Sequence, residues 1–228
     1  MIVAKLNQSE FEYDIHSLIK AFYPSENVSA TVEDKEYGEP VTSRMTVDYG
    51  ENRIDICWWN GDAKTPESSD IIAQAETEVD FSDRKEAKNS LKRLLYGMLS
   101  EHTGKKLPWG NLTGIRPTKI PMKLLEAGKS REEIRTFMKD TYAASDEKID
   151  LAVDIAEREL ALLDKIDYEN GYSLYVGIPF CPTTCLYCSF TSYPLASWEA
   201  RMDAYLDALE KEIDFVAEKF RSKYLNSI

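Results

Sequence analysis

Alternating apolar and polar positions mark the first third of the chain. The runs from Arg44 to Tyr49 and from Arg53 to Trp59 alternate in this way, and Gly50-Glu-Asn52 between them favours a β-hairpin. Further strands are expected over residues 2–6, 28–32 and 71–79, with a helix over 11–22. Residues 1–80 are therefore predicted to form a small α+β domain.

The middle of the chain, residues 81–168, changes to helical periodicity. Apolar residues between Leu91 and Leu99 share one helical stripe, and Ser82 with Asp83 is a suitable N-cap. Ser130-Arg-Glu-Glu133 matches a capping box and follows Gly128, which is expected to end a short helix. A longer helix is expected from Ser145. We interpret the apolar stripes of this helical region as core positions.

Residues 169–228 have a third pattern. Gly171 breaks the helical periodicity, Ser173–Ile178 is predicted as a short buried strand, and a long amphipathic helix is expected from near Ser197. Strand, loop and amphipathic helix form the repeating unit of parallel α/β barrels, which carry their chemistry at the strand's carboxyl end. The predicted fold class is therefore α/β: an α+β domain, a helical region and the first strand–helix unit of a barrel. Because only one such unit is visible, we expect an N-terminal fragment of a longer protein.

Composition narrows the possible partners and compartment. The chain has 228 residues, 43% of them hydrophobic, and a formal net charge of −12. This acidic balance argues against binding to nucleic acid or to an anionic membrane surface, since both need a basic footprint. No apolar run has the length of a membrane span, and the N-terminus lacks the apolar core of a signal peptide. A cytoplasmic protein with reduced cysteines is expected.

Three of the four cysteines are grouped as Cys181-Pro-Thr-Thr-Cys185-Leu-Tyr-Cys188. Three thiolates on one loop suit a [4Fe-4S] cluster, because each can bind one iron while the fourth iron stays open for chemistry. Disulfides would require an oxidising compartment. A structural zinc site usually needs four ligands, and the two histidines, His16 and His102, are distant in sequence. The spacing therefore predicts an iron–sulfur site.

Two other features allow a structural interpretation. Cys57 adjoins two tryptophans and is most simply a small buried apolar residue. In the segment Trp109–Lys119, Arg116 and Lys119 could hold an anion such as a carboxylate. The alternative is a connector in which Pro117 starts the next helix. The residues alone favour the connector, since isolated basic side chains usually face solvent.

The segment Tyr175–Phe190, which reads YVGIPFCPTTCLYCSF, resembles the radical S-adenosylmethionine superfamily. It is similar more narrowly to the oxygen-independent coproporphyrinogen III oxidase group. The stretch Trp109–Lys119 resembles one in the branch of that group with an extended N-terminal region. The resemblance covers the chain from residue 82 to the end, with a looser match before it.

The resemblance implies a set of cofactors and roles. Cys181, Cys185 and Cys188 would ligate the [4Fe-4S] cluster, and S-adenosylmethionine would bind its fourth iron. Tyr187 would contact the adenine side of this cofactor and Tyr175 would line the same site, although ordinary aromatic packing is the alternative for both. No catalytic residue is assigned. An electron from a flavodoxin- or ferredoxin-like donor would generate a 5′-deoxyadenosyl radical. This radical would take a hydrogen from a propionate side chain of a tetrapyrrole, coproporphyrinogen III, and loss of carbon dioxide would leave a vinyl group.

Some positions depart from the pattern of the group. Gly177 stands where much of the group has histidine. Phe190 stands where the decarboxylating members have a further cysteine, and phenylalanine also occurs there in relatives that resemble haem chaperones. The glycine-rich strand end that receives the methionyl group would lie beyond Ile228, so we expect the fragment to be inactive alone. The main expectation is oxidative decarboxylation of coproporphyrinogen III to protoporphyrinogen IX; a haem chaperone and a cluster-bearing interaction module remain alternatives.

Overall fold

The computed structural model describes all residues from 1 to 228, which form two compact units. Unit 1 comprises Met1–Arg158 and unit 2 comprises Glu159–Ile228. Helices and strands occur in both units, which confirms the mixed α/β class. The division at residues 80 and 168 stays a prediction.

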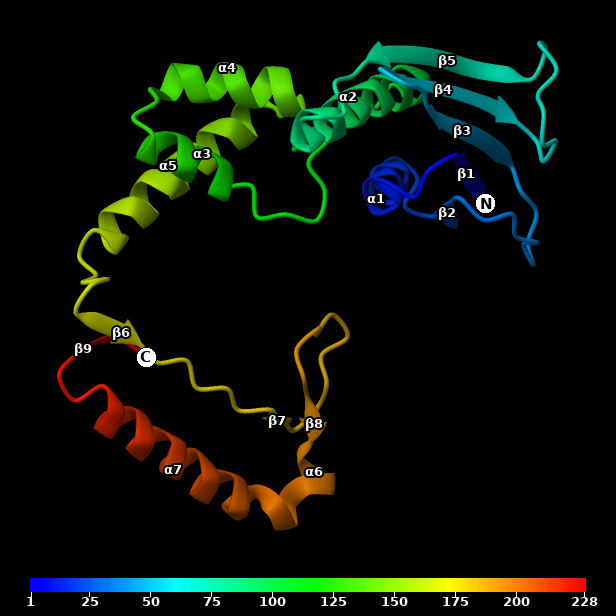
Figure 1. Ribbon diagram of the computed structural model, residues 1–228. Helices are drawn as coiled ribbons and strands as arrows, with labels where there is room; N and C mark the ends of the chain where they lie inside the picture. Colours follow the sequence, from blue (N-terminus) through cyan, green and yellow to red (C-terminus); the bar gives the residue numbers. More distant parts are fainter. The chain divides into compact units, whose positions relative to one another are not determined.

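A five-stranded sheet forms the first half of unit 1, with the strand order β2-β1-β3-β4-β5 (Figure 1). Its strands are β1 (Ile2–Leu6), β2 (Val28–Thr31), β3 (Ser43–Tyr49), β4 (Arg53–Asn60) and β5 (Ile71–Glu78). Strand β1 pairs in parallel with β2 and β3, whereas β3, β4 and β5 are antiparallel. The predicted hairpin is confirmed: Tyr49 lies opposite Ile54, and the Gly50 N–H donates to the Arg53 carbonyl at 2.8 Å.

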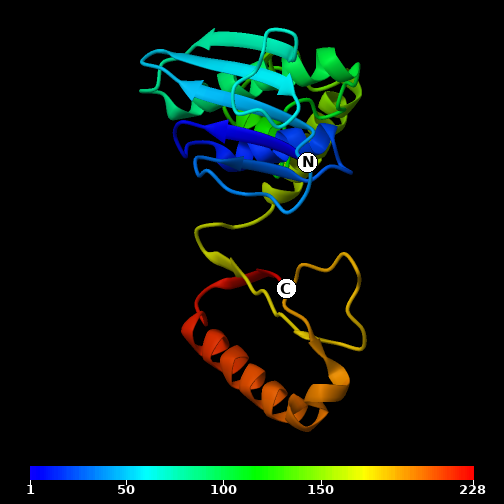
Figure 2. The ribbon, with the colours of Figure 1, turned by 90° about the vertical axis from the view of Figure 1, so that its right-hand side faces the viewer.

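Helices α1 (Glu12–Phe22) and α2 (Arg84–Thr103) pack on one face of this sheet, behind it in the view of Figure 2. The predicted stripe of α2 is buried there, with Leu91, Leu95 and Leu99 at 0% exposure. Burying a leucine side chain contributes about 1.5–3 kcal/mol, so this stripe stabilises the unit strongly. The predicted cap of α2 is confirmed, because the Asp83 carboxylate accepts from the N–H groups of Lys85 and Glu86.

Cys57 lies on the opposite face of the sheet, which differs from the expectation for this residue. Successive residues of a strand point to opposite faces, so Trp58 enters the core while Cys57 shares the outer face with Asp55. Cys57 is only half-buried, and its sulfur accepts from Gln74 Nε2 at 3.4 Å. The expectation of a buried apolar residue was therefore wrong.

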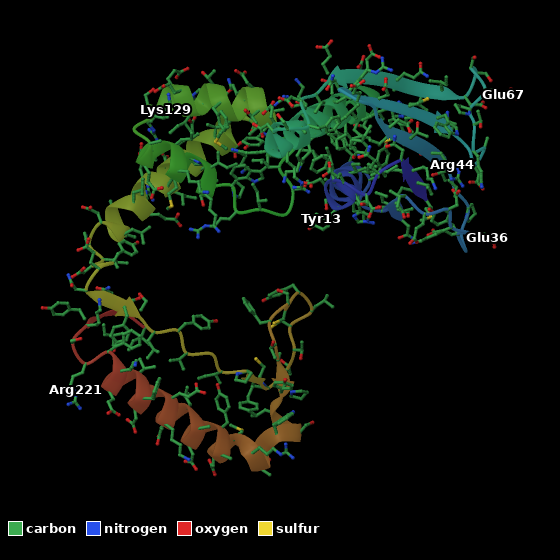
Figure 3. The ribbon with its side chains drawn as sticks, in the orientation of Figure 1. Tyr13, Glu36, Arg44, Glu67, Lys129 and Arg221 are labelled. Carbon is green, nitrogen blue, oxygen red and sulfur yellow. The ribbon has the colours of Figure 1, made fainter.

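Arg44, labelled in Figure 3, lies on β3 and forms an ion pair with Asp62.

A second core of unit 1 lies among α3 (Lys119–Glu126), α4 (Arg131–Tyr142) and α5 (Asp146–Leu163). Ile134, Met138 and Ile149 are its most deeply buried large side chains. The predicted capping box is confirmed between Ser130 and Glu133. Gly128 follows the end of α3 with φ +77°, and its N–H donates to the Leu125 carbonyl, so the predicted helix stop is confirmed as well.

Unit 2 contains a strand–helix–strand connection. Strand β6 (Gly171–Ser173) pairs in parallel with β9 (Tyr224–Ser227), and helix α7 (Met202–Lys219) lies between them in the chain. A short helix α6 (Leu195–Trp198) and a 3-10 turn (Glu199–Arg201) precede α7, and β7 (Phe180–Cys181) pairs with β8 (Tyr193–Pro194). None of the helices in the protein combines the length and apolar character of a membrane span.

Two expectations for unit 2 need correction. The predicted buried strand Ser173–Ile178 was wrong: β6 covers Gly171–Ser173, and residues 174–178 form no strand because regular pairing ends at Ser173. Tyr175 and Ile178 are exposed rather than buried. Strand β9 was not expected, since Tyr224–Ser227 shows no strong alternation of apolar and polar residues. It forms a strand because it pairs with β6, which lies about 50 residues earlier in the chain. A Cβ atom at Gly171 would lie 2.0 Å from Asn226 Nδ2, so glycine permits the close approach of these two strands.

Candidate functional site

The cysteine loop of unit 2 runs between two short strands whose ends are held by aromatic side chains. Phe180 lies opposite Tyr193 across the β7–β8 ladder. The ring of Tyr205 from α7 contacts the Phe180 ring edge-on, with 5.1 Å between the ring centroids. The ring centroids of Trp198 and Tyr193 lie 4.9 Å apart. Such pairs contribute about 0.5–1.5 kcal/mol each beyond burial. The loop therefore starts and ends at a fixed aromatic base, and it extends away from α7 in both ribbon views (Figures 1 and 2).

Hydrogen bonds add to this base. The hydroxyl of Tyr205 donates to the Gly177 carbonyl, and the Tyr193 N–H donates to the Pro179 carbonyl at 2.8 Å. Within the loop, the Cys188 N–H donates to the Cys185 carbonyl at 3.0 Å, which forms a turn between two of the cysteines. The helix α7 thus positions the segment before the cysteines through one phenol.

A pocket of about 540 Å³ lies beside the loop. It is lined by Tyr175, Cys181, Cys188, Phe190, Ser192 and Tyr205, among others. The Ser192 hydroxyl is buried and has no hydrogen-bond partner. An unsatisfied buried polar group costs about 1–3 kcal/mol, so a bound polar ligand would relieve this cost. Sequence reasoning missed Ser192 and the role of the Tyr205 hydroxyl, since neither stands out from ordinary loop or helix residues.

The three predicted ligand cysteines are all free thiols. Cys181 and Cys188 are half-buried and line the pocket, whereas Cys185 is exposed and does not line it. No group of three potential metal ligands in the chain is gathered at one point. The donor set fits an iron–sulfur cluster, and the three thiols would have to come together to hold one. Residues 182–187 are all exposed and pack little, which leaves room for that movement.

The two predicted cofactor tyrosines occupy different surroundings. Tyr175 is 89% exposed and lines the pocket together with Cys181 and Cys188. Tyr187 is 90% exposed, adjoins Cys188 in the chain and is not part of the pocket wall. Their roles toward a cofactor stay predictions.

The segment Trp109–Lys119 lies in unit 1 and is firmly anchored. Gly110 has φ +57°, and a Cβ atom there would lie 1.9 Å from the Tyr142 carbonyl oxygen. Asn111 is 1% exposed, and its backbone N–H donates to the same carbonyl at 2.8 Å. Lys92 Nζ donates to the Thr113 hydroxyl at 3.1 Å, and burial lowers the pKa of this lysine. Glycine is thus required at position 110, because the backbone of Tyr142 comes too close for a Cβ atom.

Comparison with known proteins finds relatives that are named for coproporphyrinogen III oxidation. Over 135 residues, 59% of its length, it is 39% identical to the oxygen-independent coproporphyrinogen-III oxidase-like protein HemZ of Bacillus subtilis. Over 60 residues, 26% of its length, it is 37% identical to the oxygen-independent coproporphyrinogen III oxidases of Salmonella typhimurium and Salmonella typhi. The aligned parts span only 27% of HemZ and 13% of each oxidase. No protein-family model and no solved structure matches the chain.

These relatives and the cysteine loop define the class: the chain is a homologue of the radical S-adenosylmethionine proteins of the oxygen-independent coproporphyrinogen III oxidase group. Within this group it is related to the oxidase-like protein HemZ. The resemblance to this group expected from the sequence is confirmed.

Proposed function

We propose that this chain is the cluster-bearing part of a protein that decarboxylates coproporphyrinogen III to protoporphyrinogen IX in haem biosynthesis, by radical S-adenosylmethionine chemistry. The observation that carries this proposal is the set of three free cysteines in CxxxCxxC spacing, on a loop anchored beside a pocket. The names of the relatives supply the substrate class. The tetrapyrrole substrate and a flavodoxin- or ferredoxin-like electron donor are part of the same proposal.

Cys181, Cys185 and Cys188 would hold the [4Fe-4S] cluster in this proposal. The cluster and bound S-adenosylmethionine would supply a 5′-deoxyadenosyl radical. Phe180 and the aromatic rings packed on it would keep the base of the loop rigid and exclude water from it.

Tyr175 and Ser192 line the pocket in which the cofactor would bind. The Ser192 hydroxyl is the polar group that lacks a partner there, so it would orient the cofactor by a hydrogen bond. Tyr187 would pack on the cofactor once the loop has moved, and the pocket already holds two of the three thiols.

The ligand assignment is tested with two matched cysteine variants. After anaerobic reconstitution with iron and sulfide, Cys185→Ala should lose the [4Fe-4S] absorption and the paramagnetic signal of the reduced cluster. Cys57→Ala should keep both, because Cys57 lies on the sheet of unit 1. A normal cluster in the Cys185→Ala protein would refute the assignment.

A haem chaperone is the alternative function, and Phe190 favours it because this residue replaces a cysteine of the decarboxylating members. Phe190 is 80% exposed and lines the pocket of the cysteine loop. Anaerobic incubation of the whole protein with coproporphyrinogen III separates the two functions. Vinyl-bearing product supports the oxidase, whereas tight haem binding without product supports the chaperone.

A further inference from the structure

A second pocket, of about 580 Å³, lies entirely within unit 1. It is formed by the start of α2, the segment before α3, α3 itself and the end of α4, elements that Figure 1 labels. Its apolar wall includes Ile115, Ile120, Leu124, Phe137 and Tyr142. Its volume falls in the range of small-molecule sites, which is about 300–1,000 Å³.

The charged residues around this pocket are all basic. Lys85, Lys119, Lys123 and Arg116 line it, and no acidic residue does. This is unusual for a chain with 40 acidic and 28 basic residues, in which a random surface patch would be acidic. Glu86, whose charge acts on the Tyr142 phenol, is itself paired with Arg93 at 2.6 Å.

The three lysines keep their charges available. The ammonium groups of Lys85, Lys119 and Lys123 are exposed and take part in no ion pair or hydrogen bond of the structure. Lys119 and Lys123 are four residues apart on α3, so they lie on the same face, roughly 6 Å apart along the axis. Like charges at this spacing repel each other. A ligand with two carboxylates on one edge would remove that repulsion.

The wall beneath the lysines suits a ring system. The ring centroids of Phe137 and Tyr142 lie 5.8 Å apart in an edge-to-face pair. Ile120, Leu124 and Phe137 are only partly buried against the second core, so apolar surface faces the pocket. A simple inorganic anion would use the lysines and leave this surface in water. The pocket therefore matches an apolar ring that carries carboxylates on one edge.

We propose that this pocket of unit 1 binds a tetrapyrrole through its carboxylates, with Lys119 and Lys123 holding two propionates and Phe137 contacting the ring. The choice of a tetrapyrrole among ring-bearing polycarboxylates rests on the proposed function. Charge-assisted contacts at exposed lysines are screened by salt, so the affinity falls as the ionic strength rises.

Isothermal titration of the full chain with coproporphyrin III, the stable oxidised form of the substrate, tests this proposal. The double variant Lys119→Gln/Lys123→Gln should bind about tenfold or more weakly, because two charge-assisted contacts are lost. The matched control is Lys64→Gln/Lys106→Gln, which removes the same charge at exposed lysines outside the pocket. This control should change the affinity by less than about twofold, as expected for distant, screened charges.

A second probe separates ring recognition from simple charge attraction. Butane-1,2,3,4-tetracarboxylate carries as many carboxylates as coproporphyrin III but no ring, and it should bind far more weakly. Equal affinity for both probes, equal weakening by both double variants, or no coproporphyrin binding would overturn the proposal. Cluster assembly in the Cys185→Ala comparison does not depend on these lysines, so failure here is distinguishable from failure of the proposed function.

Discussion

Unit 1 and unit 2 differ most in how much of each is buried. Unit 1 has two hydrophobic cores, one between the sheet and helices α1 and α2 and one among α3, α4 and α5. In unit 2 no residue is fully buried, and Leu206 and Phe215 on α7 are 46% and 65% exposed. Within α7 only Met202, Tyr205, Leu209 and Val216 are half-buried, and the other residues, Ile213 included, are exposed.

This difference shows that two kinds of interaction maintain the structure. Unit 1 is stabilised by burial, which adds up over many side chains. Unit 2 relies on the aromatic base around Phe180 and on a few backbone pairs such as β6–β9. Segments with few buried contacts open at low free-energy cost, and binding loops are commonly of this kind. The cysteine loop therefore lies in the part of the chain best able to change shape around a bound group.

The largest expected effect compares a leucine in each unit. Leu95→Ala should lower the free energy of unfolding by about 2–5 kcal/mol, because Leu95 is completely buried and leaves a cavity. Leu206→Ala should cost less than about 1 kcal/mol, since that side chain is largely in water already. Urea unfolding followed by circular dichroism measures both. Similar losses in the two variants would show that α7 has a core of its own.

A pair of glycines extends the comparison to the backbone. Gly110→Ala should destabilise unit 1 by roughly 2–4 kcal/mol, because the residue has positive φ and its Cβ would collide with the Tyr142 carbonyl. At Gly177 of unit 2 the Cβ would meet only the Tyr175 ring, at 3.7 Å. Gly177→Ala should therefore leave the urea midpoint unchanged. A stable Gly110→Ala protein would contradict the close packing of the Trp109–Lys119 segment.

The smallest effect concerns the capping box of α4. Ser130→Ala should cost about 1 kcal/mol at neutral pH. A hydrogen bond from Lys129, followed by those from Ser130, lowers the pKa of Glu133 from 4.5 to about 2. Since the folded state favours the ionised carboxylate, its contribution is present above pH 4.5 and is lost as the pH falls toward 2.

The matched variant for this pH effect is Glu133→Gln, which cannot ionise. Urea midpoints measured at about pH 7, 5 and 3 should fall less steeply in Glu133→Gln than in the wild type, because one group with a lowered pKa is gone. Parallel curves for the two proteins would contradict the pKa assignment. Unit 2 provides no comparable capping box, so the effect is confined to unit 1.

Short-range patterns predicted much of the fold correctly. The hairpin of β3 and β4, the Asp83 cap, the Ser130–Glu133 box and the stop at Gly128 all depend on residues within a few positions of each other. Such signals can be read directly because the interaction and the pattern span the same few residues. The spacing of the three cysteines belongs to this category, and together with the flanking residues it led to the correct group of relatives.

Only the tertiary structure decided the features that join distant residues. Strand β9 forms because Tyr224–Ser227 pairs with β6. Cys57 is half-buried because it lies on the face of β4 that does not contact the core. The lysine-lined pocket combines residues from α2, α3 and α4, which no local pattern connects. The sequence by itself determined the local elements and the spacing of the three cysteines. Packing decided which distant side chains come into contact. The burial of apolar surface stabilises a contact regardless of how far apart its residues are in the sequence.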